Sequence, residues 1–147
     1  MAEDVSTRRH LVLVVDDNPD GAESLRMVLG LCGYEARVAH TGSEGVILAR
    51  QWRPNAVVCD IGLPDLDGFG VARALRLDPA TADVFLIAMT AYGDEATRDR
   101  ARASGFDAFL VKPADPQALL TLLAGPPGAN TVRVPHRPAP GTGAVGP

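Results

Sequence analysis

Five short apolar runs recur along this chain, and amphipathic segments of helical length separate them. The runs are Leu11–Val15, Glu35–Ala39, Ala56–Cys59, Val84–Met89 and Ala108–Val111. Strands that alternate with helices in this way are typical of a parallel sheet that helices cover on both faces. The first, third and fourth runs show little polar alternation, as expected of strands buried on both sides. The sequence therefore predicts an α/β fold, a (βα)5 doubly wound five-stranded parallel sheet.

Local start and stop signals delimit five helices. Asn18 before Pro19 predicts an N-cap and a first helical residue, and Gly33 predicts the end of that helix. The second helix is expected to start at Thr41 or Ser43 and to end before Pro54. The other three are expected at about Phe69–Leu77, at Asp94–Ser104 and, after Asp115 and Pro116, at Gln117–Ala124.

Helical spacing also predicts which side chains face the core. The expected inner faces are Ala22, Leu25, Val28, Leu29 and Cys32 in the first helix, and Val46, Ile47 and Ala49 in the second. The fourth helix is polar and offers only alanines to the core, so we expect it to be loosely held. We expect Cys59 to pack against a covering helix, and the histidines at positions 10, 40 and 136 to lie on the surface.

Charge and cysteine usage argue against several classes of protein. With 14 basic and 18 acidic residues the net charge is −4, which disfavours a nucleic-acid-binding module that works through a basic face. No apolar run approaches the ~18 residues of a membrane span, and Met1–His10 lacks the apolar stretch of a secretory signal. Cys32 and Cys59 suggest neither a disulfide framework nor a zinc site. We therefore expect a reduced, soluble protein of the cytoplasm, with no membrane or nucleic-acid partner.

One domain is expected, from residue 10 to residue 124. Residues 1–9 are polar and charged, and we expect a flexible N-terminus there. Residues 125–147 hold 11 Gly or Pro in 23 positions and show no apolar period, which predicts a disordered tail.

Polar side chains follow four of the five predicted strands. Asp16 and Asp17 follow the first, Asp60 the third, Thr90 the fourth and Lys112 the fifth. Ligands of parallel α/β sheets bind beyond the carboxyl ends of the strands. If the first and third strands are neighbours, three carboxylates crowd together, which is unfavourable unless a cation lies between them. Oxygen ligands of this kind suit Mg²⁺.

Lys112 is the only lysine among 14 basic residues; the other 13 are arginine. One interpretation is codon bias with a single leftover lysine. The other is that position 112 requires a compact point charge on a flexible stem, which the planar guanidinium of arginine cannot replace.

Four rival motifs are incomplete, absent or misplaced. Gly68–Arg73 begins like a dinucleotide-binding loop, but Arg73 stands where the third glycine belongs. Neither a Walker lysine motif nor a G-x-S-x-G elbow is present. Asp65–Gly68 resembles the start of a haloacid-dehalogenase-type phosphatase motif, but that motif needs its first aspartate directly at the strand end. An independent phosphatase is therefore disfavoured, and we do not expect an enzyme.

Four segments together resemble a response-regulator receiver domain of two-component signalling, in its single-domain, chemotaxis-regulator-like form. They are LVLVVDDNP, VVCDIGLPDLDGFGVARALR, FLIAMTAY and DAFLVKP, and the resemblance covers about Leu11 to Ala124. It implies the flavodoxin-like strand order 2-1-3-4-5, in which the first and third strands are neighbours.

The resemblance also implies a phosphorylation and metal site. Asp60 matches the aspartate that takes a phosphoryl group from a phosphohistidine and becomes an aspartyl phosphate. Asp17 matches a direct Mg²⁺ ligand and Asp16 a carboxylate that holds the metal, often through water. The backbone carbonyl of Gly62 would complete the metal site.

Four further positions match the part of the family that responds to phosphorylation. Lys112 matches the lysine that pairs first with the aspartate and then with the phosphoryl group. Thr90 matches the hydroxyl that turns to a phosphoryl oxygen, and Phe109 the aromatic switch position. Pro113 matches a proline that usually follows a cis peptide bond. Phe109 has no hydroxyl, so any switch must work through packing alone.

These residues predict a phosphoacceptor that signals through a phosphorylation-dependent surface, with self-catalysed loss of the phosphoryl group as its only chemistry. The expected partner is a sensor histidine kinase or a histidine-phosphotransfer protein, followed by an unknown downstream protein. Two alternatives remain: a phosphorelay shuttle and a phosphorylation-independent interaction module.

Overall fold

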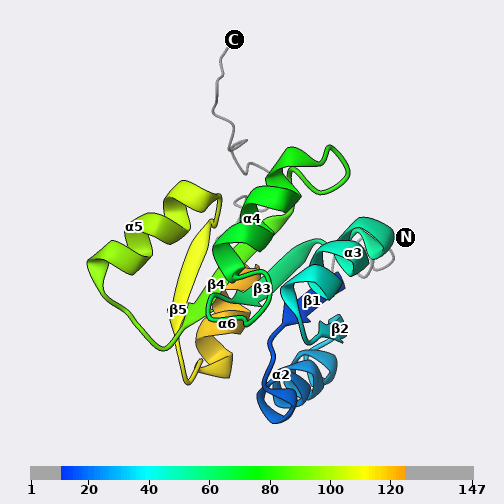
Figure 1. Ribbon diagram of the computed structural model, residues 1–147. Helices are drawn as coiled ribbons and strands as arrows, with labels where there is room; N and C mark the ends of the chain where they lie inside the picture. Colours follow the sequence, from blue (N-terminus) through cyan, green and yellow to red (C-terminus); the bar gives the residue numbers. More distant parts are fainter. Residues whose placement is uncertain (1–10, 125–147) are drawn as a thin grey trace.

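The computed structural model describes residues 11–124 of the chain. The expected flexible N-terminus, the expected disordered tail and the histidines at positions 10 and 136 lie outside these residues. Five parallel strands form one sheet in the order β2-β1-β3-β4-β5, which confirms the predicted fold (Figure 1). The strands are β1 (Leu11–Val15), β2 (Glu35–Ala39), β3 (Ala56–Asp60), β4 (Phe85–Thr90) and β5 (Ala108–Val111).

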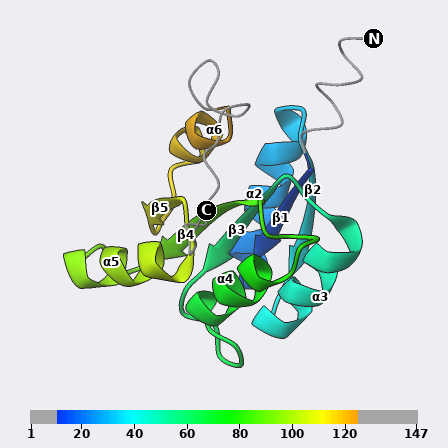
Figure 2. The ribbon, with the colours of Figure 1, turned by 90° about the horizontal axis from the view of Figure 1, so that it is seen from above.

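A helix follows each strand, and the helices form two layers. Helices α3, α4 and α5 cover one face of the sheet, and α2 and α6 cover the other (Figure 2). Their bounds are α2 (Pro19–Leu31), α3 (Gly42–Trp52), α4 (Gly68–Leu77), α5 (Glu95–Ser104) and α6 (Pro116–Ala124). The start of α2 is capped as its sequence predicts, since the side chain of Asn18 accepts a hydrogen bond from the backbone of α2. Asp94, expected as the first residue of the fourth helix, is instead the N-cap residue of α5 and accepts from its backbone in the same way.

Each face of the central strands packs into a separate core. In β1, Leu13 and Val15 point towards α3 and α4, whereas Val12 and Val14 point towards α2 and α6. Successive side chains of a strand point to opposite faces, so a strand between two helix layers must be apolar at every position. This requirement explains the lack of alternation in the sequence of β1.

The inner face of α3 differs from the prediction. Its buried residues are Gly42, Gly45, Val46 and Ala49, whereas Ile47 is exposed. A Cβ atom on Gly45 would lie 2.8 Å from Cγ2 of Val15, so glycine is what allows the helix to approach β1 so closely. Gly42 and Gly45 belong to the buried face of the helix, but a count of apolar side chains does not include them. The expectation that Ile47 faces the core was wrong. Thr41 rather than Ser43 is the N-cap of this helix, since its side chain accepts from the backbone N–H of Glu44.

The first and fourth helices also depart from expectation. Cys32 is exposed, because α2 ends at Leu31 and Cys32 is its C-cap residue rather than part of the buried face. In α5 only Ala101 of the three alanines expected at the core is buried, since Ala96 and Ala103 are exposed. Ser104 is the other buried residue, and its Oγ donates to the carbonyl of Arg100 at 2.8 Å. Cys59 is fully buried in the core beneath α3 and α4, as expected.

Within residues 11–124, no helix combines the length and the apolar character needed to cross a membrane.

Candidate functional site

Three carboxylates meet at the carboxyl ends of β1 and β3. Asp16 and Asp17 follow β1, Asp60 is the last residue of β3, and these two strands are direct neighbours in the sheet. Carboxylate oxygens of the three residues all lie within 4.8 Å of one another. Asp16 is 1% exposed and Asp60 7%, so two of the charges are nearly removed from water. Such a cluster is unfavourable unless positive charge balances it.

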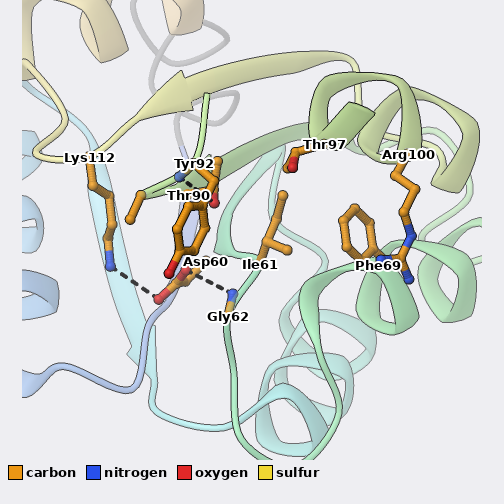
Figure 3. Close-up of a pocket in the computed structure, with 10 residues that line it drawn as sticks. Asp60, Ile61, Gly62, Phe69, Thr90, Tyr92, Thr97, Arg100 and Lys112 are labelled. Atoms are coloured by element: carbon orange, nitrogen blue, oxygen red, sulfur yellow. Dashed lines mark hydrogen bonds and ion pairs between the residues drawn. The ribbon is translucent and has the colours of Figure 1, made fainter. Parts of the chain in front are cut away.

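Lys112 brings positive charge to this cluster from the end of β5. Its Nζ lies 3.1 Å from Oδ2 of Asp60 (Figure 3). It also lies 3.3 Å from Oδ2 of Asp16. Burial lowers the pKa of the ammonium group, but the hydrogen bond to Asp60 and the charges of Asp60 and Asp16 outweigh it and raise the pKa above 10.5. Lys112 is therefore a cation at neutral pH. The peptide bond between Lys112 and Pro113 is cis, the form that the resemblance implies.

The hydroxyl and the aromatic ring of the predicted switch lie on the same face of the sheet. Thr90 ends β4 and is 4% exposed. Its Oγ1 accepts a hydrogen bond from the backbone N–H of Tyr92 at 3.0 Å. Phe109 in β5 is paired with Ala88, two residues before Thr90, so both side chains share that face. Phe109 is half-buried and packs against the core beneath α4 and α5.

The loop between β3 and α4 is held in place along its length. The backbone N–H of Gly62 donates to Oδ1 of Asp60 at 3.0 Å. Asp65 accepts from the backbone N–H of Gly42 at 3.0 Å and from Oγ of Ser43 at 2.7 Å, at the start of α3. These bonds hold the pKa of Asp65 well below its ordinary value, the hydrogen bond from Ser43 contributing most. The loop that carries the Gly62 carbonyl is therefore anchored before any ligand binds.

A cavity of about 420 Å³ extends from Asp60 towards α5. Figure 3 shows Asp60, Thr90 and Lys112 on one side of this cavity and Phe69, Thr97 and Arg100 on the other. The guanidinium of Arg100 stacks over the ring of Phe69 at 4.1 Å from its centroid. Asp60 therefore lines a cavity and is not sealed inside the core.

The donor set at the strand ends fits Mg²⁺. This ion prefers oxygen ligands, usually one or two carboxylates together with water and phosphate oxygens. Asp16, Asp17 and Asp60 offer carboxylate oxygens at one edge of the sheet, and Asp17 is exposed, which leaves a path from solvent. A divalent cation would balance the charge that Lys112 alone leaves uncompensated.

The structure brings together all the residues that the sequence placed at strand ends. It adds contacts that strand-end reasoning missed. The ring Nδ1 of His40, expected only as a surface residue, lies 3.2 Å from the backbone oxygen of Asp16. Arg98 and Arg100 stack on Phe109 and Phe69. The position of Asp65, in the loop after the predicted phosphoacceptor, can be read from the sequence. Its hydrogen-bond partners at the start of α3 cannot, because they are distant in sequence.

Comparison with known proteins agrees with this geometry. The sequence pattern of the family described as "Response regulator receiver domain" matches residues 12–124. The chain is 35% identical over 109 residues to the protein PilH of Pseudomonas aeruginosa, covering 74% of this chain and 90% of PilH. Several other curated relatives are longer, and the chain spans 41–50% of their length.

The fold is shared with solved structures of other response regulators and receiver domains. A putative response regulator from Chloroflexus aurantiacus superposes with a TM-score of 0.73 at 34% identity, covering 79% of this chain and 98% of that one. The receiver domain of the sensor histidine kinase PA1611 from Pseudomonas aeruginosa, with magnesium in its active-site cleft, has a TM-score of 0.72 at 29% identity, covering 78% and 93%. This chain belongs to the response regulator receiver domains, the phosphoacceptor domains of two-component signalling.

Proposed function

We propose that Asp60 is the phosphoacceptor of this domain and that a phosphohistidine of a sensor histidine kinase or a histidine-phosphotransfer protein is its donor. The observation that carries the proposal is the ion pair of Lys112 with Asp60 and Asp16 beside an open cavity. Lys112 is positioned to neutralise charge at the acceptor, and the cavity gives access to it. Phosphoryl transfer depends mainly on such positioning and charge neutralisation.

In the proposed reaction, a carboxylate oxygen of Asp60 attacks the phosphorus atom. The new O–P bond forms as the P–N bond to the imidazole breaks, and the imidazole leaves with the bonding electron pair and takes up a proton. The Lys112 ammonium then pairs with a phosphoryl oxygen instead of the free carboxylate. Mg²⁺, if held by Asp16, Asp17, Asp60 and the Gly62 carbonyl, would supply further positive charge to the phosphoryl oxygens.

Phosphorylation adds about one unit of negative charge, and oxygen acceptors, where a carboxylate stood. We propose that the Thr90 hydroxyl turns to donate to one of these oxygens. The ring of Phe109, on the same face of the sheet, then moves into the space that Thr90 and its loop leave. A local change of charge would thereby alter the surface around β5.

A phosphorelay shuttle would use the same acceptor, because only the recipient of the phosphoryl group differs. We propose no enzymatic activity beyond self-catalysed gain and loss of this group. A cytoplasmic location fits the proposed partners and Cys32 and Cys59, which are both free thiols.

The acceptor is tested by intact-mass measurement after incubation with a small-molecule phosphodonor and Mg²⁺. We expect one added phosphoryl group in the wild type and none in Asp60→Asn. Asp99→Asn, an exposed change on α5, is the matched control and should be labelled like the wild type. Labelling that persists in Asp60→Asn would refute the assignment, and an interaction module independent of phosphorylation would show no labelling at all.

A further inference from the structure

Helix α5 is attached to the sheet in an unusual way. Of its ten residues, only Ala101 and Ser104 are buried, so it contributes little apolar surface to the core. Two arginines on the helix lie instead over aromatic rings: Arg100 over Phe69, and Arg98 over Phe109 at 4.8 Å from the ring centroid. A guanidinium at this distance from a ring is attracted by the negative charge of the ring face. Arg98 thus lies on the residue that the proposed function assigns to the switch.

Arg98 has a second contact, with the loop that joins β4 to α5. Its Nε donates to the carbonyl of Gly93 at 3.3 Å. Gly93 itself lies tightly against β5, since a Cβ atom there would be 2.8 Å from Cγ2 of Val111. One side chain therefore connects the β4–α5 loop with the aromatic ring on β5.

The same loop is tied at its start to Thr90. The backbone N–H of Tyr92 donates to Oγ1 of Thr90. Hydrogen bonds and one cation–π contact thus run from Thr90 through Tyr92 and Gly93 to Arg98 and Phe109. If the Thr90 hydroxyl turns towards a phosphoryl group on Asp60, the bond to Tyr92 breaks and the loop that carries the Gly93 carbonyl is released.

We propose that Arg98 is a positioning residue that holds Phe109 in the conformation seen here and so opposes the response to phosphorylation. The proposal rests on the proposed function, because it concerns the regulation of the same site. Any conformation in which the ring moves inward loses its contact with Arg98. A contact present in only one of two conformations shifts the equilibrium towards that conformation by its own free energy.

The expected size of the effect follows from the exposure of Arg98. Cation–π contacts at exposed sites shift equilibria by about two- to fivefold, which is about 0.5–1 kcal/mol at 1.4 kcal/mol per factor of ten. Removing the contact should therefore tighten the binding of a phosphoryl analogue by about two- to fivefold, since less free energy opposes the switch.

The test uses Arg98→Met, which keeps an unbranched stem of similar helix propensity and removes the cation. The control is Arg102→Met on the same helix, which removes an exposed arginine whose ion pair is with Asp99. Both variants and the wild type carry 4-fluorophenylalanine in place of their four phenylalanines, and the Phe109 resonance is assigned by its loss in Phe109→Leu. Binding of beryllium fluoride with Mg²⁺, a non-transferable phosphoryl analogue, is then titrated by ¹⁹F NMR.

We expect Arg98→Met to change the Phe109 shift before any analogue is added and to bind the analogue about two- to fivefold more tightly than the wild type. Arg102→Met should match the wild type in both measurements. An unchanged Phe109 shift, or equal or weaker analogue binding by Arg98→Met, would overturn the proposal for Arg98. A wild type that binds no analogue, or an Asp60→Asn variant that binds it equally well, would instead overturn the proposed function and the regulatory role with it.

Discussion

The ion pairs of Lys112 can be tested by the change Lys112→Met, which keeps the stem and removes the charge. Its Nζ contacts Asp60 at 3.1 Å and Asp16 at 3.3 Å, and the two carboxylates are nearly buried. At an effective dielectric constant of about 20, each contact at this distance is about 5 kcal/mol of Coulomb attraction. The cost of taking the ammonium group out of water offsets much of this attraction. The net loss of stability when one partner of a buried ion pair is removed is about 3–5 kcal/mol.

Lys112 keeps 28% of its side chain exposed, so water screens part of the interaction. We therefore expect Lys112→Met to lose about 2–3 kcal/mol of unfolding free energy in the presence of a chelator. Urea unfolding with linear extrapolation measures this difference. The exposed change Arg102→Met is the control and should stay within about 0.5 kcal/mol of the wild type.

Added Mg²⁺ supplies the second half of the test. Without the ammonium group the cluster of carboxylates is more negative, so the variant should bind Mg²⁺ at least about tenfold more tightly, which is about 1.4 kcal/mol. Saturating Mg²⁺ should then restore much of the lost stability, since a site filled at 100 times its dissociation constant adds about 2.7 kcal/mol. Equal stability of the variant and the wild type in chelator, together with equal stabilisation by Mg²⁺, would show that Lys112 does not balance these charges.

Three further predictions concern other contacts of the site and its frame. Asp17→Ala should lose the rise in melting temperature that millimolar Mg²⁺ gives the wild type, and an equal rise in both proteins would exclude Asp17 as a ligand. Arg76→Lys should lower the unfolding free energy, measured with urea, by about 2–4 kcal/mol. The guanidinium of Arg76 donates to the carbonyls of Ala82, Val84 and Gly105, which a lysine cannot reach together. A loss under about 1 kcal/mol would contradict this reasoning. Asp65→Asn should be less stable than the wild type near pH 7. The folded-state pKa of Asp65 is lowered, so its contribution to the unfolding free energy is present above pH 3.8 and is lost as the pH falls through the folded-state pKa. The difference in unfolding free energy between the two proteins should therefore shrink, and not grow, on acidification below about pH 4.

Much of this molecule could be predicted from short stretches of sequence. The strands of a doubly wound sheet are recognisable because both of their faces are buried, and β1 and β3 are apolar throughout. Helix starts are local as well: Asn18 and Asp94 cap with their own side chains. Asp60 and Lys112 could be named as site residues because the ends of parallel strands meet at one edge of the sheet.

The inner face of α3 was decided by packing. Ile47 matches a helical apolar pattern as well as Val46 does, yet it is exposed, because Gly42 and Gly45 make the close contacts with the rest of the fold. A glycine has no apolar side chain to count, so only the distance to Val15 shows that this position belongs to the core.

The contacts that position the site depend on the tertiary structure in the same way. Asp65 meets the start of α3 from 22 or 23 residues away, and Arg98 reaches Phe109 across the sheet edge. Such contacts have no fixed spacing along the chain. They depend on how two elements pack against each other and not on the side-chain periodicity of either helix or strand. The residue types at the strand ends are therefore enough to predict the chemistry of the site. The packing of loops and helices around them determines how the site residues are positioned and how the site is coupled to the surface.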